Sequence, residues 1–343
     1  MEALRRQNSA IFNAFTEAMA NIHNGADIRR LEQAIEAGDV DGAMRALNLS
    51  PAAMDGMREA IRNAFLAGAT YQVALAPKPL VAGLSAEFQG YHPRVIEWIE
   101  RNAGGMVAET VAEQRRVIRQ TIATGFEQRR GYKAIALDLV GRMDGNSRKG
   151  GVVGLLSREA DYVANLRDAL SGADVGKTST GQTKFWIKED GTLGSTYKLR
   201  DGRFDRTIAK AIREGRPIPA DVLENAAARY GARLLRERGR RISRTEGNRA
   251  MNEGRAEAVR QMIDRGDAAA ADITKEWRHT RKPGQRDNHA AINRQARAWG
   301  ERFDNGLLWP HEEGAPASEV VNCACFIHTR TDWVAVARRR GTF

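Results

Sequence analysis

Residues 240–258 read RRISRTEGNRAMNEGRAEA, a helical stretch whose polar residues recur at helical spacing. Asn248 and Asn252 are four residues apart, so they share one face of the predicted helix. Polar side chains that face inward need hydrogen-bond partners. We therefore expect the Arg244, Glu246 and Asn248 cluster to dock this helix against the C-terminal segment. Contact with an anion or a nucleic acid is the alternative.

The expected partner segment, 318–333, reads SEVVNCACFIHTRTDW and contains both cysteines of the chain. Residues i and i+2 of a strand point to the same side, so the two thiols could face one ligand. Zinc sites use Cys and His, usually with two to four residues between paired cysteines. Here the spacer is one residue, and a second pair would come from the histidines at 279, 289, 311 and 328. The metal-ligand candidates are Cys323, Cys325, His289 and His328.

Two other interpretations of the cysteine pair stay open. Free cysteines are often buried and inert, so the pair could simply fill a small core. Cys323 could also be a nucleophile with His289 as its base, although a strand lacks the helix N-terminus that lowers a thiol pKa. A disulfide between them would be strained and needs an oxidising compartment, whereas two cysteines in all favour a reducing one. We assign no catalytic or cofactor-binding residue and commit to no metal.

The residues after Gly266 differ in character from those before it. Four of the six tryptophans and four of the six histidines lie beyond residue 272, among short β-type runs. Trp277 and His279 alternate on a predicted strand, and Arg286 and His289 lie on a predicted helical turn. We therefore predict a small α+β domain over 267–335.

The preceding chain is predicted to be mainly α-helical, with long helices. Met54, Met57, Ile61 and Phe65 recur at three- and four-residue steps, which indicates one apolar helix face. A helix that starts at Pro93 is expected to end at the Gly104–Gly105 pair. Asp190–Gly191 between aromatic and β-branched residues indicates a β-hairpin inserted near 183–200. The predicted segments are an N-terminal helical region (1–142), a loop, helix and hairpin insertion (143–202), a helical segment with helices over 221–240 and 242–265 (203–266), the α+β domain (267–335) and a basic tail (336–343).

The chain is strongly basic, with a net charge of +11 over 343 residues. Ten of its 54 basic residues are lysines, which leaves 44 arginines. Arginine pairs bidentately with phosphate, so the surplus favours a polyanionic neighbour. No helix-turn-helix, zinc-finger or RNP signature is present, and the glycine-rich loop at 143–156 lacks the spacing of a P-loop. We therefore expect contact with double-stranded DNA that is indifferent to sequence, and no secretory leader or membrane anchor.

Five motifs in a fixed order resemble the phage Mu F-like minor head proteins, also called phage head morphogenesis proteins, of tailed bacteriophages. The resemblance covers about 205–330. Its motifs are SRTEGNRAMNEGR (243–255), WRHT (277–280), RDNH (286–289), FDNGLLWP (303–310) and GAPASEVVNCACF (314–326). The chain departs from the family pattern at Ala324, where arginine is usual, and at RKPGQ and INRQ. The resemblance implies fold-defining roles for Arg244, Glu246, Trp277, His289, Asn322, Cys323 and Cys325.

The resemblance also implies a function. It predicts a non-enzymatic structural protein of the virion, a minor capsid protein active in head morphogenesis. Such a protein would lie inside the capsid near the portal, contact the portal protein, other head proteins and packaged DNA, and act in assembly or DNA ejection. It would occupy the host cytoplasm during assembly. The alternatives are a Cys/His metal-dependent hydrolase or nuclease, and a non-viral DNA-binding protein.

Overall fold

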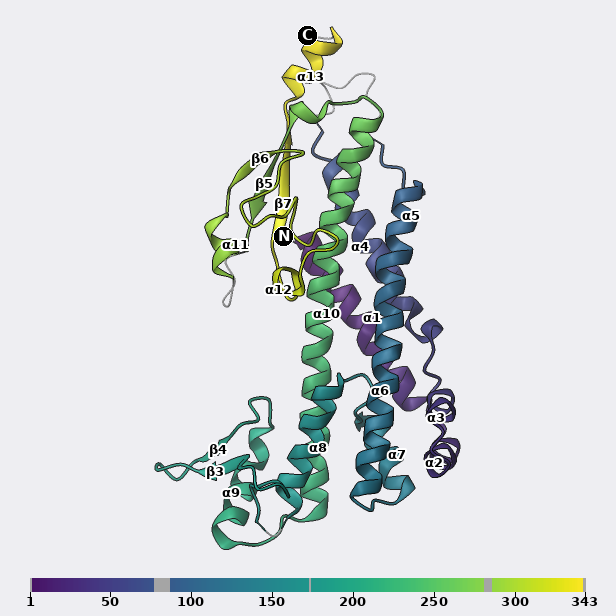
Figure 1. Ribbon diagram of the computed structural model, residues 1–343, viewed down its shortest axis with the longest axis vertical. Helices are drawn as coiled ribbons and strands as arrows, with labels where there is room; N and C mark the ends of the chain where they lie inside the picture. Colours follow the sequence, from purple (N-terminus) through teal and green to yellow (C-terminus); the bar gives the residue numbers. More distant parts are fainter. Residues whose placement is uncertain (1, 77–86, 173, 281–285, 342–343) are drawn as a thin grey trace. The chain divides into compact units, whose positions relative to one another are not determined.

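The computed structural model describes residues 2–76, 87–172, 174–280 and 286–341 (Figure 1). Helices account for 61% of the structure and strands for 10%, and the strands form small antiparallel sheets. The predicted fold class, mainly α with a small C-terminal α+β domain, is therefore confirmed. Within these residues, no helix combines the length and the apolar character that crossing a membrane requires.

The chain divides into two compact units, and each is assembled from separated stretches. The first contains residues 1–15, 55–105 and 240–343, and the second contains residues 16–54 and 106–239. The predicted segments follow the order of the chain, whereas these units bring distant stretches together.

The first unit contains most of the features that resemble the head proteins. Its helices are α4 (Asp55–Val73), α5 (Pro93–Ile99), the π-helical turn η3 (Glu100–Gly104), the 3-10 turn η5 (Ala270–Asp272), α11 (Asp287–Ala291), α12 (Ala317–Val320) and α13 (Trp333–Arg340), with the first part of α1 (Glu2–Asn24) and the last part of α10 (Ala220–Asp264). Of the predicted apolar stripe, Met57, Ile61 and Phe65 are buried on α4, which confirms that periodicity. The Phe65 ring lies 4.9 Å from that of Trp98 on α5.

Helix α4 approaches α10 through two glycines. A Cβ atom on Gly254 would lie 2.0 Å from the carbonyl oxygen of Phe65, and one on Gly68 would lie 2.2 Å from that of Met251. No side chain fits at either distance. Glycine at both positions therefore lets the two backbones touch.

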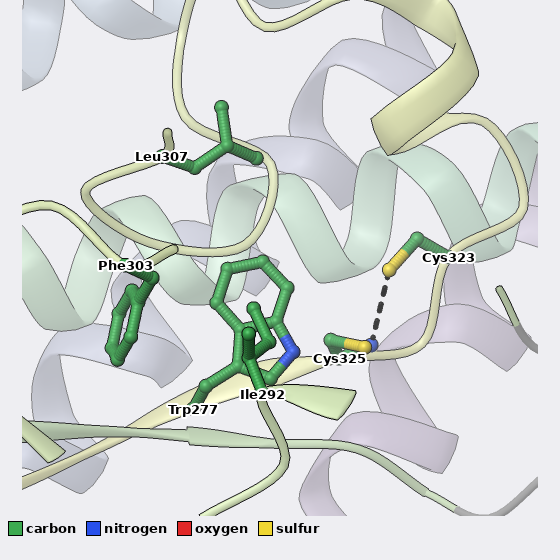
Figure 2. Packing of buried hydrophobic residues seen from close by; sticks show 6 residues of the cluster. All are labelled: Trp277, Ile292, Phe303, Leu307, Cys323 and Cys325. Carbon is green, nitrogen blue, oxygen red and sulfur yellow. Dashed lines mark hydrogen bonds between the residues drawn. The ribbon is translucent and has the colours of Figure 1, made fainter. Parts of the chain in front are cut away.

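A three-stranded antiparallel sheet forms the centre of the C-terminal domain. Strand β5 (Ile273–Arg278) lies between β6 (Ala296–Ala298) and β7 (Phe326–Thr331), with Trp277 opposite Ile327. The core around Trp277 contains Ile292, Phe303, Leu307, Cys323 and Cys325 (Figure 2). The first turn of α13 begins where Asp332 accepts a hydrogen bond from the Ala335 amide at 3.0 Å.

The second unit combines helices with two hairpins. Its elements are α2 (Ile28–Glu36), α3 (Val40–Ala46), η1 (Pro51–Met54), nearly all of α6 (Gly105–Glu127), α7 (Tyr132–Val140), β1 (Gly141–Asp144), β2 (Ser147–Gly150), α8 (Ser157–Ser171), β3 (Phe185–Ile187), β4 (Leu193–Ser195), η4 (Gly202–Phe204) and α9 (Asp205–Glu214), with the last part of α1 and the first part of α10. Leu31, Val117, Leu139 and Val163 are among its fully buried residues. The strands β3 and β4 confirm the hairpin predicted near 183–200.

Four local expectations differ from the structure. The loop expected at 143–156 contains most of the β1–β2 hairpin, whose turn falls at Gly145 with a positive φ. The helix expected to end at the Gly104–Gly105 pair continues through η3 into α6. The two helices expected over 221–240 and 242–265 are the single helix α10. Residues 336–340 of the expected basic tail belong to α13, where Val336 is buried.

Candidate metal centre

The C-terminal half of α10 and residues 322–327 are joined by side-chain hydrogen bonds that we call the polar ladder. Asn248 donates to the Cys323 carbonyl at 3.0 Å, and Asn252 donates to the Cys325 carbonyl at 3.1 Å. Arg255 donates to the Ile327 carbonyl at 3.0 Å. Positions 248, 252 and 255 lie on one helix face, and alternate residues of an extended chain point the same way. The spacing of these side chains along the helix therefore matches the spacing of alternate carbonyl groups along the extended chain.

At the Asn248 end of the polar ladder, further hydrogen bonds fix the turn before the cysteines. Asn322 has a φ of 60°, a left-handed conformation that asparagine adopts more readily than most residues. Its amide donates to the Thr245 hydroxyl at 2.9 Å, and its side-chain oxygen accepts a hydrogen bond from Arg244. The expected docking by Arg244 and Asn248 is thus confirmed. Glu246 instead pairs with Arg249 on α10, at 3.1 Å.

The two cysteines lie in extended chain just before β7, not within it. The amide of Cys325 donates to the Cys323 sulfur at 3.3 Å, which turns both sulfurs inward (Figure 2). Cys323 and Cys325 are not joined by a disulfide, and both are buried in the core with Trp277. This packing agrees with the interpretation that the pair fills a small core.

His289 completes the group from the short helix α11. Its Nδ1 atom lies 3.5 Å from the sulfur of Cys323 and 3.5 Å from that of Cys325. Its Nε2 atom, on the other side of the ring, lies 2.6 Å from a carboxylate oxygen of Glu319. The ring is 1% exposed and packs edge-on against Trp277, with 5.0 Å between ring centroids.

The surroundings of this group lower the pKa of the Cys323 thiol and raise that of the His289 imidazole. A hydrogen bond with Cys325 lowers the pKa of Cys323 most, burial opposes it, and His289 and His311 lower it further, to about 2. Burial lowers the pKa of His289, but hydrogen bonds with Cys323 and Glu319 outweigh burial and raise it overall. Both metal ligation and nucleophilic chemistry use the thiolate form of cysteine.

The structure thus brings three of the four candidate ligands together. The ligand atoms of His289, Cys323 and Cys325 all lie within 4.8 Å of one another, so the group could hold a metal ion. His328 lies elsewhere, on β7 opposite Glu276, where it lines a cavity of about 360 Å³. The backbone amide of His279 donates to the side chain of Asn293 at 3.2 Å.

Two residues beside the group were not singled out from the sequence. Glu319 orients His289, yet the two are 30 residues apart and no spacing rule joins them. His311 was one of four histidines considered but was not chosen. It is 2% exposed, and neither ring nitrogen has a hydrogen-bond partner among the described residues. In the sequence, only the concentration of histidines beyond residue 272 pointed to His311.

Comparison of the chain with protein-family models, curated proteins and solved structures finds no match. The resemblance to phage head morphogenesis proteins therefore stays a prediction from the motifs.

Proposed function

We propose that the protein is a minor head protein of a tailed phage, located at the portal vertex inside the capsid. One observation supports this most. The motif positions behind the resemblance are spread over about eighty residues, yet they meet in one place: Arg244 bonds Asn322, Asn248 bonds Cys323, and His289 contacts both cysteines. Motifs that build one interior are expected to persist together in a structural protein.

Mass spectrometry of purified particles tests this proposal. The chain should be present at low copy number in procapsids or mature heads of the phage that encodes it. Absence from both would overturn the proposal. An Asn252→Ala variant, which breaks the polar ladder, should enter fewer particles than an Asn63→Ala variant. Asn63 is exposed on α4, so it makes a matched control.

A basic cavity of the second unit supports contact with packaged DNA. The cavity has a volume of about 320 Å³ and contains more basic than acidic side chains: Arg142, Lys149, Arg203, Arg229, Arg233 and Arg236 against Asp144, Asp201 and Glu224. Arg229 and Arg236 are exposed. Exposed arginines at a cationic rim bind phosphate without reading bases.

Replacing Arg229 and Arg236 together by alanine should weaken binding to duplex DNA of any sequence. The slope of log K against log salt should fall by about 0.9 for each phosphate that the variant no longer neutralises. A double Arg5→Ala, Arg6→Ala variant removes the same charge from exposed positions on α1 and is the control. Equal loss of binding in both variants would mean that net charge alone, not this cavity, attracts DNA.

We also propose that the ion held by His289, Cys323 and Cys325 is zinc. Zinc bonds of about 2.3 Å to sulfur and 2.0 Å to nitrogen, at the tetrahedral angle, place those atoms about 3.6 Å apart. The observed separation from His289 Nδ1 to each sulfur is 3.5 Å. The Glu319 carboxylate on Nε2 is the outer partner that zinc-bound histidines commonly have.

Zinc measured by mass spectrometry on purified protein should approach one ion per chain. Glu319→Gln should weaken zinc binding about 10–100-fold, because it loosens the orientation of His289. Glu313→Gln, at a half-exposed carboxylate bonded to Arg101, should leave zinc binding unchanged. Metal-free wild-type protein that takes up no added zinc would overturn the assignment.

A further inference from the structure

We propose that His311 is the fourth ligand of this centre, which makes it a closed Cys2His2 site rather than an open one. The inference rests on the proposed zinc ion and adds the residue that completes its coordination. It also separates the two chemical roles open to the site. A structural zinc has four protein ligands, whereas a catalytic zinc has three and a water.

The state of His311 is the first observation behind this proposal. Its side chain is 2% exposed, and both ring nitrogens are buried without a hydrogen-bond partner in the described part of the chain. A buried imidazole with neither nitrogen satisfied is costly, because it has lost water and gained nothing in return. A missing ion is one of the recognised explanations for such a group.

The position of His311 is the second observation. His311 lies between Leu307 and Ala315, and both of these residues pack in the core that contains Cys323 and Cys325. His311 follows Pro310 and has a φ of 65°, an uncommon value for a residue other than glycine or asparagine. His311 lies in the loop from Leu307 to Glu312. Leu307 packs beside the cysteines, and the Glu312 carboxylate accepts a hydrogen bond from the Leu308 amide at 2.9 Å. The loop therefore places His311 beside the core that contains the two sulfurs.

Metal binding would still have to bring His311 close to the other three ligands. His289 and the two cysteines are already mutually close, whereas His311 is not among the atoms that lie within 4.8 Å of one another. We expect the His311 ring to turn toward the ion when it binds. Two thiolates and two neutral imidazoles then balance the charge of Zn²⁺, which suits a buried position beside Trp277.

Cobalt substitution in the full chain tests the proposal, because Co²⁺ reports coordination number by its visible spectrum. Cobalt-loaded wild-type protein should give the intense bands of a four-coordinate tetrahedral site. His311→Ala should give the weaker bands of a site opened to water, and its zinc affinity should fall by more than about 100-fold, since even outer-shell losses reach that value. His328→Ala, in the same domain but outside the group, should leave spectrum and affinity unchanged.

The His311→Cys variant is a control for misfolding of His311→Ala. It offers a third thiolate at the same place, so the tetrahedral bands should return with stronger sulfur-to-cobalt charge transfer. A wild-type spectrum and wild-type affinity in His311→Ala would overturn the role of His311 while leaving zinc in place. Failure of wild-type protein to bind zinc or cobalt at all would overturn the zinc proposal as well.

Discussion

Helix α10 contacts α4 and the C-terminal segment by opposite means. Toward α4 it presents Gly254, and the missing side chain brings the two backbones into contact. Toward residues 322–327 it presents Asn248, Asn252 and Arg255, and each of these side chains donates a hydrogen bond to a backbone carbonyl oxygen. The first contact depends on shape alone, and the second depends on directional hydrogen bonds. Helix α10 therefore tolerates few substitutions on either face, for different reasons.

Substitution of Gly254 by alanine should have the largest effect on stability. A Cβ atom there would lie 2.0 Å from the Phe65 carbonyl oxygen, so one helix must shift. We expect a loss of about 3 kcal/mol in the free energy of unfolding, measured by chemical denaturation. Gly56→Ala on α4 is the control, since nothing lies within 4 Å of its added Cβ. It should stabilise by about 0.5–1 kcal/mol. If both variants behave alike, the close contact of α4 and α10 is wrong.

Asn252→Ala should have the next largest effect. Its side chain donates to the Cys325 carbonyl and accepts from the Ile327 amide at 3.2 Å, and both backbone groups would be left buried without a partner. The expected loss is about 2 kcal/mol. Asn225→Ala, exposed on the same helix, should change the free energy of unfolding by less than about 0.5 kcal/mol. Equal effects would contradict the polar ladder.

Lys275 should affect stability in a pH-dependent way, because its buried side chain can carry a charge that the amides of the polar ladder lack. The side chain is fully buried, and its Nζ donates to the Trp299 carbonyl at 2.7 Å among the rings of Trp299, Phe303 and Trp309. Burial lowers its pKa from 10.5 to about 8. Between these values the folded protein has lost a proton that the unfolded chain keeps, so stability rises with pH.

Lys275→Met should remove that rise, which is at most about 3 kcal/mol for a pKa lowered from 10.5 to about 8. Denaturation midpoints measured at intervals from about pH 7.5 to 10.5 would show it. Lys188→Met, at an exposed lysine, should keep the wild-type pH dependence. A wild-type slope in Lys275→Met would mean that this ammonium is not desolvated.

Local patterns in the sequence predicted the local parts of the fold. The Met57, Ile61 and Phe65 stripe and the Asp190–Gly191 hairpin each depend on residues a few positions apart, and both are present. The docking role of Asn248 was also predictable, because an inward-facing amide needs a partner. The predicted helix end at Gly104–Gly105 was wrong, because a π-helical turn carries the chain onward into α6.

The missed features depend on contacts between distant residues. No residue near Gly254 in the sequence indicates that the backbone carbonyl of Phe65 will contact it. Glu319 and His289 are likewise joined only by the folded chain. The sequence predicted His328, and not His311, as a candidate ligand beside the cysteines. The strand β7, however, carries His328 away from the sulfurs, to a position opposite Glu276.

Hydrogen exchange at the Ile327 amide is the most direct test of the polar ladder. This amide donates to the Asn252 side chain of α10. We predict that it exchanges as slowly as the amides of α10 around residue 252, and that Asn252→Ala selectively speeds its exchange. Exchange of the Ile327 amide at the rate of an unstructured peptide, while α10 stays protected, would contradict the docking of the C-terminal segment on α10.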